Sequence, residues 1–281
     1  MASLSEWTTV PVTSANLETV LAVVSDAAYR DDASLVSGLT AQGLRQLDLT
    51  GSGTGTYVAG NAAFDTWTTV VNNEPAAIIA FRGTDDINYS LDGLSAYLGS
   101  ADAAYWLDTK GYYDLLGSGV AAFDAAVSAL GIEQVYVTGH SLGGAAAQAY
   151  MAAHQDTADT SYTAVTFGSL GLSGDGTWST DGRITDFADA SDFTNSLGTQ
   201  TAGLTITVST GETSLSSSGL DLATLIRDPA SFLDTHSISL FAGDAAAYDA
   251  AKAGIAATDA TTFFTAKAAY DGVTLAVSSS L

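Results

Sequence analysis

The chain has 281 residues, 47% of them hydrophobic, a size that allows one large α/β domain or two small ones. Its 31 acidic residues against 8 basic ones give a net charge of −23, which repels phosphate backbones and argues against nucleic-acid binding. The absence of cysteine excludes disulfides, thiolate catalysis and Cys-based metal sites. No apolar run approaches the ~18 residues of a membrane-spanning helix.

The spacing of apolar residues predicts helices and strands that alternate along the chain. Helices are expected over residues 14–29, in the stretch that ends at Leu130, and over 142–154 and 242–269. Strands are expected over residues 66–71, 76–81, 134–138, 162–167, 183–187 and 273–277, and Asn72–Pro75 is typical of a hairpin turn between the first two. This alternation predicts a mainly parallel central sheet with helices on both faces. We find no repeat and no break in composition, so we expect one domain over 1–281.

The sequence Gly-His-Ser-Leu-Gly-Gly, residues 139–144, fits the G-x-S-x-G pattern of a nucleophile elbow. A β-branched strand leads into it and a helix of small residues leads out, which is the setting that such an elbow requires. Small neighbours let the helix and the strand approach closely around a strained turn. We therefore predict that Ser141 is a nucleophile rather than part of an ordinary glycine-rich turn.

A serine hydroxyl needs a base to take its proton, and the chain has three histidines to choose from. His140 adjoins Ser141 on the tight turn, where its side chain points away, and we expect it to pack under the elbow. His154 lies about 18 Å along the next helix, too far to reach Ser141, and is expected to be a polar group at the helix end. By elimination, the base is His236.

The carboxylate that orients the base is expected between Ser141 and His236, after the end of a strand. Asp189 and Asp192 follow the strand at 183–187 and are the candidates, whereas Asp175 and Asp181 lie in a glycine-rich turn and are interpreted as turn formers.

Two backbone N–H groups are expected to stabilise an oxyanion. One belongs to Leu142, directly after the nucleophile. The other is expected in the loop that ends the strand at 76–81, where Gly83 permits a sharp turn and Thr84 offers both a backbone N–H and a hydroxyl.

Together these motifs resemble those of the class 3 lipases, which show F-R-G-[ST], G-H-S-L-G-G and T-F-G-[SA]-P in this order. The matching residues are Phe81–Thr84, Gly139–Gly144 and Thr166–Ser169, and Lys110–Tyr112 looks like the family's H-x-G-[FY] element with Lys in place of His. The resemblance runs from about Leu17 to His236 and implies an α/β-hydrolase fold. It also implies that Thr84 and Leu142 form the oxyanion hole and that a lid follows Asp85.

The lid is expected over 87–109, a segment more apolar than a loop needs to be; an ordinary core helix is the alternative.

Two departures from the family affect the motifs. Leu170 replaces the family's proline, and the usual D-x-V-P around the acid is absent. An ungapped match to R-I-T-x-x-x-D puts the acid at Asp189. We favour Asp192, because Phe193 after it could anchor the loop, and keep Asp189 as the alternative.

The termini bear on localisation. The first 14 residues, MASLSEWTTVPVTS, lack the basic and long apolar regions of a secretory signal. Residues 243–281, a helical extension with no clear family counterpart, are similar to C-terminal secretion signals of one-step bacterial export, although an ordinary terminal helix and strand would look the same. We expect a secreted bacterial protein without an N-terminal signal peptide, with a cytoplasmic location as the alternative.

The expected function is hydrolysis of acyl esters by a Ser141–His236–Asp192 triad, in a lipase or carboxylesterase acting on lipid at a lipid–water interface. A phospholipase A1 and a cutinase-like polyester hydrolase are alternatives within the fold, and a non-catalytic adhesion or carrier module is an alternative of another class. No cofactor and no catalytic metal are expected. The aspartates leave room for a structural Ca²⁺, but no complete ligand loop is present.

Overall fold

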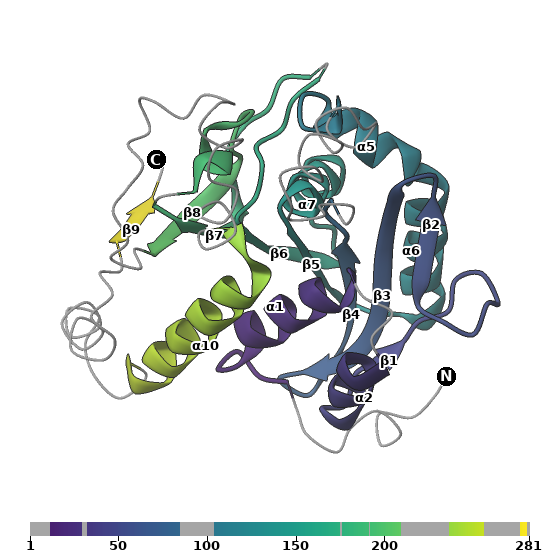
Figure 1. Cartoon of the computed structure of the whole chain (residues 1–281). Helices are drawn as coiled ribbons and strands as arrows, with labels where there is room; N and C mark the ends of the chain where they lie inside the picture. Colours follow the sequence, from purple (N-terminus) through teal and green to yellow (C-terminus); the bar gives the residue numbers. More distant parts are fainter. Residues whose placement is uncertain are drawn as a thin grey trace.

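A nine-stranded sheet organises the part of the chain that the computed structural model describes, residues 12–29, 33–84, 104–174, 176–190, 192–208, 236–255 and 276–279 (Figure 1). Its strands lie in the order β1-β3-β4-β5-β6-β7-β8-β9, with β2 paired to β3. The strands are β1 (Arg45–Gln46), β2 (Thr56–Ala59), β3 (Ala62–Val71), β4 (Glu74–Phe81), β5 (Gln134–His140), β6 (Ser161–Phe167), β7 (Asp181–Asp189), β8 (Ala202–Val208) and β9 (Ala276–Ser279). The pairs from β4 to β8 are parallel and the outer pairs antiparallel, so the expected mainly parallel sheet is confirmed.

Helices cover both faces of this sheet. They are α1 (Leu17–Ala27), α2 (Ala33–Ala41), α5 (Thr109–Leu115), α6 (Gly117–Leu130), α7 (Leu142–Ala153) and α10 (Ile238–Ile255), with a short 3₁₀ helix η2 (Phe193–Ser196). Alternate residues of β4 enter two separate cores: Ile79 packs with α5, α6 and α7, and its neighbour Ile78 packs with α1, α2 and α10. This two-sided burial explains why β4 is almost continuously apolar.

The hairpin between β3 and β4 has a two-residue turn, shorter than the four residues that the sequence suggested. Val71 pairs with Glu74, and the intervening Asn72 and Asn73 have φ of 51° and 73°. Two positive φ angles belong to the type I′ turn, whose twist suits the flanking strands and which asparagine tolerates well.

Helix α10 lies beside α1 in front of the sheet (Figure 1). The Asp249 carboxylate of α10 accepts hydrogen bonds from the Thr19 backbone N–H (2.8 Å) and hydroxyl (2.6 Å) of α1. Lys252 adds ion pairs to Asp249 and Glu18. Helix α10 therefore packs firmly on the domain that holds the sheet, and β9 extends that sheet beyond β8.

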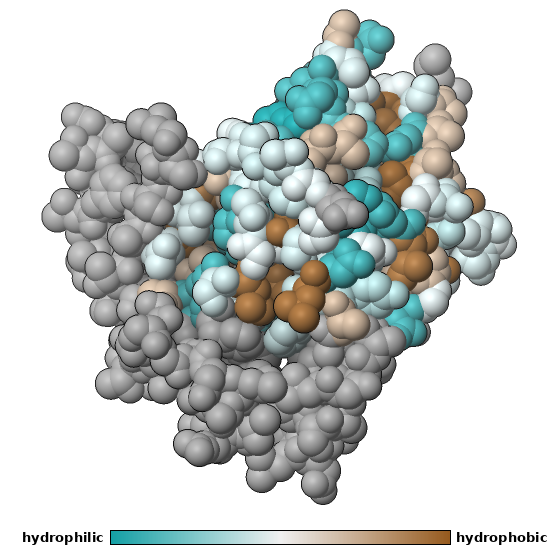
Figure 2. All heavy atoms as spheres, turned by 90° about the horizontal axis from the view of Figure 1, so that it is seen from above, coloured by the Kyte–Doolittle hydropathy of each residue, from teal (hydrophilic) through white to brown (hydrophobic). Residues whose placement is uncertain are grey.

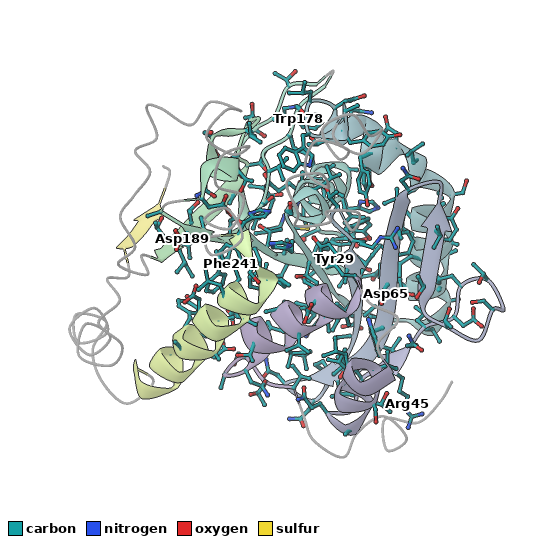
Figure 3. The ribbon with its side chains drawn as sticks, in the orientation of Figure 1. Tyr29, Arg45, Asp65, Trp178, Asp189 and Phe241 are labelled. Carbon is teal, nitrogen blue, oxygen red and sulfur yellow. The ribbon has the colours of Figure 1, made fainter. Side chains whose placement is uncertain are left out.

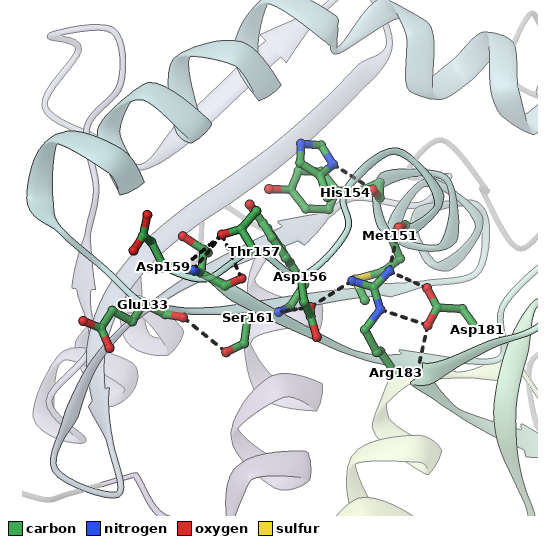
Figure 4. A network of polar contacts seen from close by, with 12 residues as sticks. Glu133, Met151, His154, Asp156, Thr157, Asp159, Ser161, Asp181 and Arg183 are labelled. Carbon is green, nitrogen blue, oxygen red and sulfur yellow. Dashed lines mark hydrogen bonds and ion pairs between the residues drawn. The ribbon is translucent and has the colours of Figure 1, made fainter.

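A second polar network joins the end of α7 to the start of β7 (Figure 4). The Arg183 guanidinium donates to the Met151 carbonyl (3.0 Å) and to the carboxylates of Asp156 (3.0 Å) and Asp181 (2.6 Å). Asp181 thus anchors an arginine in addition to starting a strand. The neighbouring strands β6 and β7 are held in register at the end opposite to the nucleophile elbow.

Several expected segments differ from the structure or extend beyond the described residues. The stretch before Leu130 forms two helices, α5 and α6. Most of the lid expected at 87–109, residues 87–103, lies outside the described part of the chain, as do Asp175 and residues 256–275 and 280–281 of the C-terminal extension. Within the described ranges, no helix is both long and apolar enough to span a membrane.

The chain order of the sheet brings the candidate residues together. Thr84 follows β4, Ser141 follows β5, Asp192 follows β7 and His236 precedes α10. Parallel neighbouring strands end at the same edge of a sheet, so their following loops meet there. A mainly parallel sheet with a strand–nucleophile–helix turn, followed in the chain by an acid and a base, is the α/β-hydrolase fold.

Candidate active site

Ser141 occupies a strained turn between β5 and α7. Its φ of 59° and ψ of −126° lie in a region that a residue with a Cβ rarely adopts and that costs roughly 1–3 kcal/mol. Glycines make the turn sterically feasible: a Cβ on Gly139 would lie 2.3 Å from the Gly143 carbonyl oxygen, and one on Gly143 would lie 2.1 Å from the Phe81 carbonyl oxygen. The glycines of the motif are thus required by the close approach of α7 to β4 and β5.

His236 and Asp192 complete a hydrogen-bonded chain with this serine. The Ser141 hydroxyl lies 2.8 Å from His236 Nε2, and the Asp192 carboxylate lies 2.6 Å from His236 Nδ1. An ionised carboxylate can only accept, so the imidazole proton is on Nδ1, and Nε2 is left as the acceptor for the serine proton. All three residues are buried, with 5% or less of their surface exposed. Low exposure strengthens these electrostatic contacts.

The acid loop explains which carboxylate reaches the base. Strand β7 continues to Asp189, which pairs with Val208 of β8. Asp192 lies beyond the strand and caps η2, its Oδ1 accepting the Thr194 backbone N–H at 3.0 Å. The Thr194 hydroxyl also lies 3.3 Å from His236 Nδ1. The structure therefore places Asp192, the acid that we favoured, at the imidazole, and Asp189 in the strand (Figure 3).

The loop that carries Thr84 packs against the nucleophile elbow. A Cβ on Gly83 would lie 2.5 Å from the His140 carbonyl oxygen, and the start of α7 touches the backbone of Arg82 and Gly83 through Gly143. Thr84 and Leu142, the two expected oxyanion residues, are both at least 90% buried and belong to these touching segments. The indole Nε1–H of Trp106 donates to the Thr84 hydroxyl at 3.2 Å.

His140 hydrogen-bonds to the backbone of the base, His236. Its Nε2 lies 2.7 Å from the His236 carbonyl oxygen, and its Nδ1 lies 2.8 Å from the Tyr29 hydroxyl. A carbonyl can only accept, so Nε2 carries the proton and Tyr29 donates to Nδ1. Burial, together with the neighbouring His236, lowers the pKa of His140 well below its usual value of 6.5. His140 is a neutral structural link between α1, the elbow and the base.

The third histidine is remote from this site. His154 follows the end of α7 (Figure 4), stacks on Tyr150 with a 3.8 Å centroid separation, and lies 3.1 Å from an Asp124 carboxylate oxygen. His154 is therefore a polar group at the end of a helix, as the sequence predicts. Among the residues with described placement, no group of three His, Asp or Glu side chains is arranged to hold a metal ion.

A buried serine hydrogen-bonded to a histidine, a carboxylate on the far ring nitrogen and a helix N-terminus beside the serine form an arrangement suited to acyl transfer. Comparison with known families agrees with this chemistry, because the family described as lipase (class 3) matches residues 78–176. The resemblance to the class 3 lipases is confirmed over this stretch. The matched residues include the second half of β4 (78–81) with the Thr84 loop, the whole elbow and β6.

Solved lipase structures also resemble the chain, at low identity. Lip2 lipase from Yarrowia lipolytica is 13% identical, with a TM-score of 0.46, covering 69% of this chain and 78% of the lipase. Lipase II from Rhizopus niveus is 15% identical, with a TM-score of 0.47, covering 73% and 82%. The lipase from Rhizopus microsporus var. chinensis is 15% identical, with a TM-score of 0.47, covering 71% and 75%. No curated protein matches the chain significantly.

Sequence reasoning did not identify Thr194 or Tyr29 as neighbours of the site, and it placed Trp106 in the expected lid at 87–109 without its contact to Thr84. For Thr194 a signal existed, since Asp-x-Thr is a pattern in which the aspartate caps a short turn. Tyr29 and Trp106 act across 111 and 22 residues of sequence respectively, and no local pattern marks such long-range contacts.

Proposed function

We propose that this protein is a carboxylic-ester hydrolase of the lipase or carboxylesterase type, with Ser141 as nucleophile, His236 as general base and Asp192 as the carboxylate that orients it. The observation that carries the proposal is the continuous chain from the Ser141 hydroxyl to His236 Nε2 (2.8 Å) and from His236 Nδ1 to Asp192 (2.6 Å). The match of residues 78–176 to a lipase family supports the same class of chemistry.

In the proposed reaction, Ser141 Oγ attacks the ester carbonyl while His236 Nε2 takes the hydroxyl proton. The charged imidazole is stabilised by Asp192 and then gives its proton to the leaving alcohol. Water, activated by the same base, attacks the acyl-enzyme, releases the carboxylic acid and restores the serine. Every proton transfer in this scheme passes through His236 Nε2.

The oxyanion of each tetrahedral intermediate is assigned to the backbone N–H groups of Leu142 and Thr84, with the Thr84 hydroxyl as a third donor. Leu142 is the first residue of α7, so the positive end of the helix dipole also faces the developing charge. Protein groups thus supply nucleophile, base and oxyanion donors, and the proposed reaction needs no cofactor and no catalytic metal.

We place the substrate among acyl esters with an apolar chain, met at a lipid–water interface. Leu107, next to Trp106, is 79% exposed, and Leu115 of α5 is 42% exposed. Figure 2, which views the molecule from above, shows groups of apolar residues among hydrophilic ones. The net charge of −23 disfavours an anionic phospholipid surface, so the lipase or carboxylesterase reading is preferred to a phospholipase A1.

A non-catalytic adhesion or carrier module is the competing proposal. A module of that kind has no use for the strained Ser141 backbone or for a buried histidine–carboxylate pair, both of which cost stability. These features favour a catalytic role.

The test is hydrolysis of a chromogenic short-chain ester by the purified chain and by the Ser141→Ala variant. We expect turnover by the wild-type protein, and a fall in kcat of ~10⁴ or more in the variant with an unchanged circular dichroism spectrum. His154→Ala is the control and should keep its activity, because His154 lies at the far end of α7. An inactive wild-type protein, or full activity in Ser141→Ala, would refute the proposal. A panel of esters of graded chain length, with a polyester film as one substrate, then ranks lipase, esterase and polyester hydrolase.

Localisation is part of the proposal. We assign the export information of a secreted chain to residues 243–281. Deletion of residues 256–281 from the chain in a bacterium with a one-step export system should retain the protein inside the cell. Continued export would contradict it.

A further inference from the structure

One buried carboxyl group near the proposed triad takes no part in the mechanism. Asp186 of β7 is 3% exposed, and its Oδ1 accepts the Thr166 hydroxyl at 2.7 Å. Its carboxyl group also accepts the backbone N–H of Ser169. Thr166 lies directly opposite Asp186 in the parallel pair of β6 and β7, so the carboxyl group links the strand to the turn that follows β6.

That turn, Phe167–Leu170, contacts each element of the triad. The Phe167 carbonyl accepts the Ser141 backbone N–H (3.0 Å), and the Leu170 N–H donates to the Ser141 carbonyl (3.2 Å). The Gly168 carbonyl accepts the Thr194 hydroxyl at 3.5 Å, in the loop that Asp192 caps. The turn is therefore bonded to both sides of the nucleophile and to the acid loop.

The same turn packs closely against the base, His236. Gly168 has a φ of +49°, and a Cβ there would lie 3.2 Å from His236 Nδ1 and 2.7 Å from the Phe241 ring of α10. A small shift of this backbone would move the imidazole relative to Ser141. Asp186 holds this conformation through the N–H of Ser169, the residue after Gly168, together with the bonds from the Gly168 N–H to the Phe187 carbonyl (2.7 Å) and from the Gln200 amide to the Ser169 carbonyl (2.8 Å).

We propose that Asp186 is a positioning residue for catalysis, which fixes the Phe167–Leu170 turn and through it the distance between Ser141 and His236. The inference rests on the proposed function of the triad. Asp186 would affect the rate through geometry. Hydrolysis requires the reacting groups to be correctly placed, and a misplacement of about 1 Å can lower the rate by roughly 10²-fold. A buried carboxyl group with two hydrogen bonds supplies directional contacts that an apolar residue of the same size would not.

An asparagine at this position should reproduce the function. Burial raises the pKa of Asp186 to about 7, with the charge of Asp192 adding to the rise, so the neutral carboxyl is present near neutral pH. Asparagine resembles that neutral form. Its carbonyl oxygen can accept the Ser169 N–H, and its NH₂ can donate to the Thr166 hydroxyl oxygen.

The chain offers a matched control in Asp249, which is also 3% exposed and also accepts one threonine hydroxyl and one backbone N–H. Its threonine and backbone partners belong to α1, its ion-pair partner Lys252 belongs to α10, and all of them lie outside the site. Asp249→Ala therefore removes the same two kinds of hydrogen bond, together with one ion pair, from a buried carboxyl group without touching the turn.

The experiment measures kcat and KM for a short-chain ester, and the rate at which a fluorophosphonate labels Ser141, in Asp186→Ala, Asp186→Asn and Asp249→Ala. We expect Asp186→Ala to lose ~10–100-fold in kcat and in labelling rate with KM nearly unchanged. Asp186→Asn and Asp249→Ala should stay within about threefold of wild type in kcat. Circular dichroism and thermal unfolding verify that each variant is folded.

Wild-type kcat in folded Asp186→Ala would overturn the inference, as would an equal loss in Asp249→Ala or in Asp186→Asn. If Asp186→Ala does not fold, Thr166→Val decides. That variant removes one hydrogen bond from the carboxyl group and should lower kcat by about 3–10-fold without raising KM, whereas an unchanged kcat overturns the inference. An active Ser141→Ala protein would refute the proposed function itself. A dead Ser141→Ala beside a fully active Asp186→Ala would refute only the role of Asp186.

Discussion

Replacing Asp192 by asparagine is the most informative single change, because the structure dictates which way the new amide must face. Asp192 Oδ1 accepts the Thr194 backbone N–H at 3.0 Å, while Oδ2 lies 2.6 Å from His236 Nδ1. An asparagine oxygen must take the Oδ1 position to accept the Thr194 N–H. Its NH₂ group then faces Nδ1 and donates to it, so the imidazole proton moves to Nε2, where it blocks the acceptance of the Ser141 proton.

Two contributions set the size of the loss. Turning the amide over restores the right tautomer but leaves the buried Thr194 N–H without its acceptor, at a cost of ~1–3 kcal/mol, about 5–150-fold in rate. The variant also loses the negative charge that stabilises the imidazolium. At an effective dielectric constant of about 20, unit charges about 4 Å apart interact by about 4 kcal/mol, or ~10³-fold. The two factors multiply to roughly 5 × 10³–10⁵, and we expect kcat to fall by ~10⁴, the size typical of a triad carboxylate replaced by its amide.

The assay compares kcat for a short-chain ester in Asp192→Asn and Asp189→Asn, with circular dichroism as the check on folding. Asp189→Asn should stay within a few-fold of wild type in kcat, because the carboxylate at Nδ1 belongs to Asp192. A crippled Asp189→Asn beside an active Asp192→Asn would refute the assignment and support the ungapped match to the family pattern.

Three further predictions test the surroundings of the triad. Thr84→Val keeps the backbone donor and should lower kcat by ~10²–10³ if the hydroxyl acts on the oxyanion; an unchanged kcat would assign the stabilisation to the backbone alone. Gly143→Ala puts a Cβ 2.1 Å from the Phe81 carbonyl oxygen and should lower the free energy of unfolding by ~1–3 kcal/mol and impair kcat, whereas Gly117→Ala, with open space around its Cβ, should do neither. His140 has a lowered pKa in the folded protein, so below about pH 6.5 the unfolded chain binds a proton at this residue that the folded chain does not. The contribution of His140 to the free energy of unfolding therefore falls on acidification by up to ~1.4 kcal/mol per pH unit. Urea unfolding between pH 5 and 8 should show a shallower acid loss in His140→Asn, and equal slopes would contradict this account.

Much of the fold could be predicted because its signals are local. The hairpin between β3 and β4, the two-sided apolar strand β4 and the strand–serine–helix element each depend on residues close together in sequence, although the turn of the hairpin is two residues long instead of four. The choice of His236 needed no tertiary structure either. Only three histidines exist, and the local geometry of a helix and of a turn excludes the other two.

The acid was harder to predict, because its position depends on where a strand stops. Strand β7 runs through Asp189 under the pairing of β8, and the chain needs the next few residues to turn towards His236. A count of residues from Arg183 cannot reveal that extension. The same holds for Tyr29, Asp186 and Trp106, whose partners lie 17 to 111 residues away in sequence and are chosen by sheet order.

Three unfavourable features of the described residues lie close to one serine. Ser141 has a strained backbone, His140 is buried in a neutral form, and Asp186 is buried with a raised pKa. Each costs stability relative to a relaxed or apolar alternative, and each contacts the elbow or the turn Phe167–Leu170. At the opposite end of α7, Arg183 makes partly exposed ion pairs that connect β7 to the segment before β6 at little cost. A fold selected for stability alone would distribute such costs or remove them. Their concentration where Ser141, His236 and Asp192 meet is the physical reason for assigning catalysis to this end of the sheet.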